Sequence, residues 1–223
     1  MNQKLTGKQY ALLASMLFGM FFGAGNLIFP IILGAKAGAS LVPALLGMLI
    51  TAVGMPLLGI VALGVSRSSG LMQMSGRVAK WYSYFFTCAL YLTIGPFFAI
   101  PRCAATSFTM GIAPLVSGSH TVPQAIFTTL FFAAVLFFAL RPNNIMNSIG
   151  KYLNPIFLVC LGILVVAALL DPIQSVRSVA ASGAYADNAF STGFLQGYDT
   201  LDALASLAFG IIVVNVIKEM GVE

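Results

Sequence analysis

Residues 21–30 read FFGAGNLIFP and lie inside an uncharged run, residues 9–35, that is long enough to cross a membrane. A membrane helix needs roughly 20 mostly apolar residues. Glycine, asparagine and proline all disfavour a helix interior, so this composition predicts a short unwound segment within a first membrane span. Unwound backbone is tolerated at membrane depth only where it lines a cavity or meets a ligand. Its N–H groups then suit a carboxylate and its carbonyls suit a small cation.

A structural meaning of the same glycines stays open. Gly19 and Gly23 are spaced as Gly-x-x-x-Gly, a pattern that often marks close packing of two membrane helices. A dinucleotide-binding loop is excluded, because the third glycine and a preceding strand are both missing.

A similar interruption occurs near the end of the chain, where residues 196–203 read QGYDTLDA. Carboxylates within a membrane are costly and usually functional, so Asp199 and Asp202 are candidate site residues. The alternative is an outer loop over residues 188–202 followed by a helix that starts at Leu201. In that case the two acids would cap the helix and complement its dipole.

The whole chain has the composition of an integral membrane protein. Of its 223 residues 59% are hydrophobic and 8% are charged, with a mean hydropathy of +0.97, whereas soluble domains carry about 25% charged residues. The apolar runs lack the alternation of a membrane β-barrel. We therefore predict an all-α, polytopic membrane protein with a single transmembrane domain over residues 1–223 and about six spans. The predicted spans are 10–33, 42–65, 81–101, 123–140, 152–170 and 190–217.

The basic residues predict an orientation in the cell (inner or plasma) membrane with both termini in the cytoplasm. Cytoplasmic segments carry an excess of Lys and Arg, and this orientation places eight basic residues inside and three outside. The inner group is Lys4, Lys8, Arg67, Arg77, Lys80, Arg141, Lys151 and Lys218. The outer group is Lys36, Arg102 and Arg177.

Several other classes of function are disfavoured. The net charge of +5 does not indicate nucleic-acid binding, because the basic residues form no cluster. One histidine and three cysteines in separate apolar runs give no metal site and no catalytic triad. No phosphate-binding loop is present. We therefore predict no enzyme activity, no catalytic residues, no metal and no cofactor.

At its two interruptions the chain resembles the branched-chain amino acid:cation symporter (LIVCS) family. The matching blocks are FGAGNLIFP at residues 22–30, GPFFAIPR at 95–102 and GYDTLDAL at 197–204. The family is similar to amino-acid transporters built from inverted five-helix repeats, in which the first and sixth helices are broken. The resemblance implies that the chain forms the first repeat plus helix six. It also implies a secondary active symporter that imports Leu, Ile and Val with a Na⁺ or H⁺ gradient.

The resemblance further implies roles for individual residues. The substrate carboxylate would bind backbone amides of Phe22, Gly23, Ala24 and Gly25. Asn26 would bind the coupling cation. The substrate would be covered by Gly197, Tyr198, Asp199 and Thr200. Asp202 would hold the substrate ammonium group or organise helix six.

The sequence departs from the family in two ways. An acid usually follows Ser-Phe after the Pro-Arg block, whereas Ser107-Phe108 is followed here by Thr109. Family members are also about twice as long, which predicts that this chain is an N-terminal half whose C-terminal half is a missing partner. The alternative function is a non-transporting membrane assembly or a channel-like subunit, although no ring of filter residues is evident.

Overall fold

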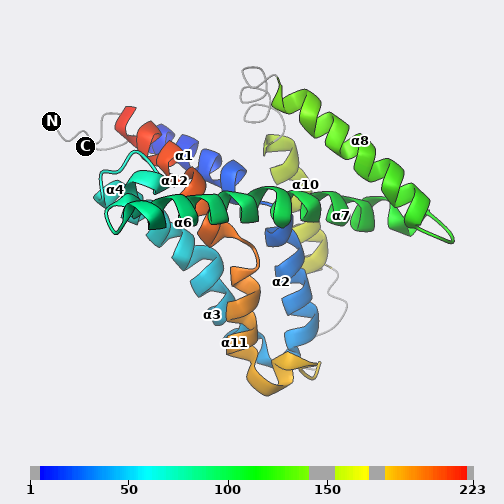
Figure 1. Cartoon of the computed structure of the whole chain (residues 1–223). Helices are drawn as coiled ribbons and strands as arrows, with labels where there is room; N and C mark the ends of the chain where they lie inside the picture. Colours follow the sequence, from blue (N-terminus) through cyan, green and yellow to red (C-terminus); the bar gives the residue numbers. More distant parts are fainter. Residues whose placement is uncertain (1–5, 141–153, 171–178, 220–223) are drawn as a thin grey trace. The chain divides into compact units, whose positions relative to one another are not determined.

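The computed structural model describes residues 6–140, 154–170 and 179–219, and every regular element within these ranges is helical (Figure 1). Four helical stretches are long and apolar enough to span a membrane, and a shorter apolar one covers Pro155–Leu170. These stretches are Ala24–Val65, Lys80–Leu115, Thr121–Ala139 and Ala184–Lys218. The structure therefore confirms the all-α, polytopic membrane class.

Internal contacts divide the chain into two compact units. The first unit comprises Met1–Ile94 and Ala168–Glu223, and the second comprises Gly95–Ala167. The single transmembrane domain stays a prediction.

The first unit begins with two short helices in place of one continuous span. Helix α1 (Gly7–Phe21) and helix α2 (Ala24–Ala37) are separated by Phe22 and Gly23, which are extended. Thr6 and Gln9 form a capping box at the start of α1, which satisfies two of the N–H groups that a helix start leaves unpaired.

A 3₁₀ turn, η1 (Gly38–Ser40), leads from α2 into a long second run. That run consists of α3 (Leu41–Leu49), the π-helical segment η2 (Ile50–Gly54) and α4 (Met55–Val65). Two further helices follow, α5 (Leu71–Gly76) and α6 (Lys80–Leu92). The unit is completed from the end of the chain by α11 (Ala184–Tyr198) and α12 (Asp202–Glu219).

Small residues allow α11 to lie directly against α3. A Cβ atom added to Gly193 would lie 2.7 Å from the carbonyl carbon of Ala44, and one added to Gly47 would lie 2.8 Å from the backbone nitrogen of Phe194. Close approach of this kind is the usual function of glycine in membrane helix interfaces.

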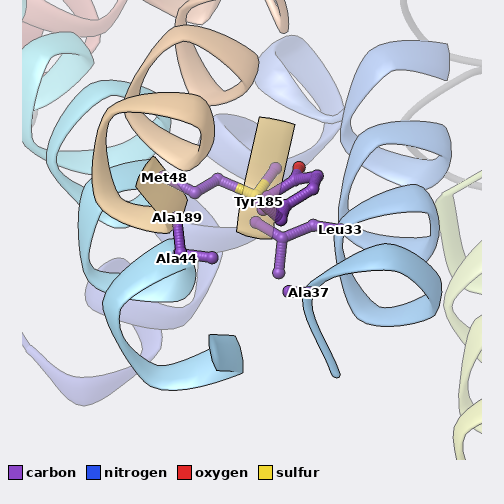
Figure 2. Close-up of a cluster of buried hydrophobic side chains, with 6 residues drawn as sticks. All are labelled: Leu33, Ala37, Ala44, Met48, Tyr185 and Ala189. Atoms are coloured by element: carbon purple, nitrogen blue, oxygen red, sulfur yellow. The ribbon is translucent and has the colours of Figure 1, made fainter. Parts of the chain in front are cut away.

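Helices α2, α3 and α11 share one buried cluster (Figure 2). Its members are Leu33, Ala37, Ala44, Met48, Tyr185 and Ala189. A second cluster joins α5, α6 and α12 through Leu71, Leu90 and Ala208. The first unit thus has one apolar core on each side of the interruptions in its helices.

The second unit contains α7 (Ala99–Gly111), η4 (Ala113–Leu115), α8 (Thr121–Ala139) and most of α10 (Asn154–Leu170). Phe108 on α7 is 3% exposed, and its ring centre lies 5.8 Å from that of Phe127 on α8. Thr109 is exposed and donates a hydrogen bond to the Ala105 carbonyl within its own helix, at 2.8 Å.

The helix bounds differ most from the predicted spans at two places. The third span was predicted to end at residue 101, but the chain kinks at Gly95 in η3 (Thr93–Phe97) and α7 continues to Gly111. Pro101 lies in the first turn of α7, where its missing N–H costs no hydrogen bond. The last span was predicted to begin at residue 190, whereas α11 begins at Ala184.

Some residues used in the predictions lie outside the described ranges. They are Lys4, Arg141, Lys151, Arg177 and the first two residues of the fifth predicted span. Arg102 is the fourth residue of α7 and is half-buried, so it lies inside a helix and not at the predicted end of one.

Candidate functional site

Both predicted interruptions are present in the helices of the first unit. The first is the extended pair Phe22 and Gly23, between α1 and α2. The second covers residues 199–201, between α11 and α12. Leu201 there has a φ of +68°, in the left-handed region that leucine rarely adopts. Pro30 does not interrupt its helix, because α2 continues through it to Ala37.

The alternative interpretation of the second interruption is partly wrong. Residues 188–198 lie within α11 and do not form an outer loop, although Asn188 has non-helical torsion angles. Asp202, however, does lie in the first turn of α12, where an acid complements the helix dipole.

A hydrogen bond joins the two interrupted helices. The side-chain nitrogen Nδ2 of Asn26 donates to Oδ2 of Asp202 at 2.6 Å. The carboxylate can only accept, which fixes the orientation of the Asn26 amide. Asp202 is 5% exposed, so this bond partners a buried charge.

The backbones of the two interruptions also approach closely. A Cβ atom on Gly25 would lie 3.1 Å from Cα and 3.3 Å from the carbonyl oxygen of Thr200. The Thr200 hydroxyl donates to the Gly197 carbonyl at 2.8 Å and accepts from the Asp202 N–H at 3.4 Å. The second interruption is therefore held by its own threonine and lies against the start of α2.

Two helix N-termini meet at this point, since α2 begins at Ala24 and α12 begins at Asp202. Helix N-termini carry partial positive charge and unpaired N–H groups. Pro30 has no N–H to donate to the carbonyl of Asn26, four residues earlier. The start of α2 thus offers donors for an anion, and Asn26 offers acceptors.

One of these acceptors is buried without a partner. Among the described residues, the side-chain oxygen Oδ1 of Asn26 is shielded from solvent and accepts no hydrogen bond. Buried acceptors are nearly always paired. The arrangement therefore leaves a position where a cation or an N–H donor would be stabilised.

A pocket of about 250 Å³ opens beside the Asn26–Asp202 pair. Asn26 and Asp202 are its polar residues, and the rest of its lining is apolar. The apolar lining comprises Leu17, Phe18, Phe21, Phe22, Ala52, Val53, Pro56, Leu57 and Ile60. The site therefore combines one charged end with an apolar body.

The π-helical segment η2 forms part of the pocket wall and was not predicted. Pro56 cannot donate to the carbonyl of Ala52, which favours a locally widened helix. Thr51 in this segment is fully buried, and its hydroxyl donates to the Phe194 carbonyl of α11 at 2.7 Å. Its signals in the sequence are Thr51 and Pro56 inside the apolar run 37–66.

The predicted site residues fall into two groups. Those brought together at the interruptions are Phe22, Gly25, Asn26, Thr200 and Asp202. Of these, Phe22, Asn26 and Asp202 line the pocket, and Gly25 and Thr200 form the close backbone contact beside it. The other predicted residues, which neither line the pocket nor form this contact, are Gly23, Ala24, Gly197, Tyr198 and Asp199. Their predicted roles in binding substrate stay predictions.

Gly197 has a clear packing role. A Cβ atom there would overlap the Thr51 hydroxyl and lie 2.5 Å from the Met48 carbonyl oxygen. Gly197 therefore keeps the end of α11 against α3. Tyr198 is 42% exposed, and Asp199 is also exposed.

Replacing Thr51 by valine is expected to lower the free energy of unfolding by about 0.5–1 kcal/mol, because the Phe194 carbonyl loses a buried donor. The change keeps the shape of the side chain, so packing is preserved. The measurement is an unfolding titration of the purified protein in detergent. Thr129→Val is the control, because Thr129 is exposed and, within the part of the chain that the structure describes, its hydroxyl bonds to Ala125 in its own helix. Equal effects at both positions would contradict a stabilising role for the hydrogen bond from Thr51 to Phe194.

Comparisons with known proteins identify relatives of this chain. The sequence profile described as branched-chain amino acid transport protein matches residues 6–223. The branched-chain amino acid permease BrnQ of Lactobacillus delbrueckii subsp. lactis is 53% identical over 224 residues, covering 100% of this chain and 50% of that protein. BrnQ of Bacillus subtilis (strain 168) is 45% identical over 222 residues, covering 99% and 50%. The chain thus spans about half the length of these relatives, and no solved structure matches it.

Proposed function

The chain belongs to the branched-chain amino acid transport protein family, and we propose on this basis that it forms part of a secondary transporter for Leu, Ile and Val. The proposed transporter is a symporter driven by a Na⁺ or H⁺ gradient. The family consists of transport proteins and not of enzymes, as the sequence predicted.

The observation that carries this proposal is the meeting of two interrupted helices at the Asn26–Asp202 hydrogen bond. A free amino acid has a carboxylate, an ammonium group and a side chain, and the site has a counterpart for each. The Asp202 carboxylate would receive the ammonium group. The N–H groups at the start of α2 would receive the carboxylate. The apolar lining of the pocket would receive the branched side chain.

The coupling cation is proposed to bind Asn26. Its side-chain oxygen is buried and unpaired among the described residues, and amide oxygens are suitable ligands for small hard cations. A cation at this position would lie beside the Asp202 carboxylate and offset its charge. Cation binding and substrate binding would then take place at one junction.

The remaining parts of the proposal concern the complete protein. We propose that it lies in the cell (inner or plasma) membrane with both termini in the cytoplasm. This orientation places eight basic residues on the cytoplasmic side and three on the outer side. Because the relatives are about twice as long, a further set of helices would complete the transport pathway. The alternative is a non-transporting membrane assembly or channel-like subunit.

Binding of radiolabelled L-leucine to the purified chain in lipid nanodiscs tests the proposal. We expect saturable binding that unlabelled Ile and Val displace and that Lys and Glu do not. Absence of displaceable binding by folded protein would contradict it. Uptake into proteoliposomes under a Na⁺ gradient or a pH gradient then identifies the coupling ion. A channel-like subunit would dissipate the Na⁺ gradient without any dependence on leucine.

A further inference from the structure

The pocket beside the Asn26–Asp202 pair has a definite direction. A Cβ on Gly197 would meet Thr51, one on Gly59 would meet Ser206, and one on Gly210 would meet Ile60. The run α11–α12 therefore lies beside α3–α4 and points the same way. Ser206 lies beside Gly59, and Asp202 precedes Ser206 by about one helical turn. Asp202 therefore lies about one turn before Ile60 along the common direction of the two helices.

Residues of α1, of η2 and of α4 supply most of the apolar lining. On α4 and the segment before it, Val53, Pro56 and Ile60 follow the spacing of one helix face. On α1, Leu17 and Phe21 are four residues apart and also share a face. Leu17 lies one turn before Phe21, so it is on the side of the pocket away from the interruptions.

Leu17 and Ile60 therefore lie at the end of the pocket farthest from the polar pair. One turn of helix is about 5.4 Å along its axis. An amino acid whose ammonium group binds Asp202 would direct its side chain along α1 and α4 toward these two residues. We expect an isobutyl or isopropyl group to fit within about one helical turn and a longer side chain to meet Leu17 or Ile60.

We propose that Leu17 and Ile60 form the floor of the side-chain subsite and set an upper limit on the length of the substrate. This inference rests on the proposed function and assigns its selectivity to two named residues. The floor admits Val, Leu and Ile and excludes Met and Phe. Neither residue contributes a polar group, so selection is by shape alone.

The test is displacement of bound radiolabelled L-leucine from the chain in nanodiscs by unlabelled Val, Leu, Met and Phe. With Leu17→Ala and with Ile60→Ala, we expect the concentration of Phe or Met needed for half-displacement, relative to that of Leu, to fall by about tenfold or more. With Leu17→Phe, which raises the floor, the ratio for Leu relative to Val is expected to rise by about tenfold. Ratios within one variant do not depend on the fraction of protein that is folded.

Val61→Ala is the matched control. Val61 follows Ile60, is 57% exposed and does not line the pocket, so the wild-type order of competitors should remain. If the wild-type chain binds leucine but the Leu17 and Ile60 variants keep the wild-type ratios, these two residues do not limit the length of the substrate. The proposed function then stands. If the folded wild-type chain binds no leucine, the proposed function itself is wrong.

Discussion

Replacing Asn26 by alanine is expected to weaken leucine binding by about 10- to 100-fold and, in the complete transporter, to abolish gradient-driven leucine uptake. The change removes the donor that bonds Asp202 at 2.6 Å and the buried oxygen proposed to bind the cation. A hydrogen bond to a charged group contributes about 1.5–3 kcal/mol, which corresponds to that range of affinity. The measurements are leucine binding in nanodiscs and uptake into proteoliposomes under each ion gradient.

Variants of the two acids near the second interruption provide the matched control. Asp202→Asn removes a carboxylate that is 5% exposed and bonded to Asn26, so we expect a loss similar to that of Asn26→Ala. Asp199→Asn removes an exposed carboxylate that does not line the pocket, so binding should remain within a fewfold of wild type.

The double variant distinguishes a shared site from two independent effects. If Asn26 and Asp202 act together, the loss in the double variant is smaller than the sum of the two single losses. If Asn26 only packs between helices, its replacement lowers thermal stability and leaves the leucine affinity of folded protein unchanged. That outcome would contradict the assignment of Asn26 to the site.

Local composition was enough to predict where the helices of the first unit are interrupted. Gly23, Gly25 and Asn26 disfavour a continuous helix over a few residues, and so do Gly197 and the acids that follow it. The observed interruptions, at residues 22–23 and 199–201, lie within or next to these two stretches. Pro30 also favoured an interruption, but the helix is not interrupted there, because α2 tolerates a proline once it has begun.

The contact between the interruptions required the tertiary structure. Asn26 and Asp202 are 176 positions apart, and no local sequence pattern predicts a hydrogen bond between them. The π-helical segment around Thr51 was missed for a related reason. Its run is apolar and helical throughout, so its hydropathy matches that of an ordinary span. The hydrogen bond from Thr51 to the Phe194 carbonyl, which holds this segment against α11, is seen only in the structure.

Individual roles were harder to predict than the location of the site. Tyr198 and Asp199 belong to the interrupted stretch, yet both are exposed and neither lines the pocket. Gly197 lies against α3, where its missing side chain permits close packing. Adjacent residues at an interruption point in different directions, so a motif locates a site more reliably than it assigns contacts.

Replacing Gly193 by alanine is expected to destabilise the protein strongly, whereas the same replacement at Gly34 is expected to be neutral or stabilising. A Cβ on Gly193 would overlap the carbonyl oxygen of Ala44 and lie 2.7 Å and 2.9 Å from its carbonyl carbon and Cα. Backbone atoms cannot rotate away, so α11 and α3 must separate. That movement would also weaken the bond from Thr51 to Phe194 and the cluster that contains Ala44 and Ala189.

Gly34 lies within α2, and nothing is within 4 Å of a Cβ added there. Alanine favours a helix over glycine by about 1 kcal/mol, so Gly34→Ala should raise the midpoint of thermal unfolding or leave it unchanged. Overpacking at Gly193 should cost about 1–3 kcal/mol or more and lower the midpoint by several degrees. Thermal unfolding of both variants in the same detergent gives the comparison. Equal midpoints would show that α11 and α3 do not pack as described, and would remove the support that holds the second interruption against Asn26.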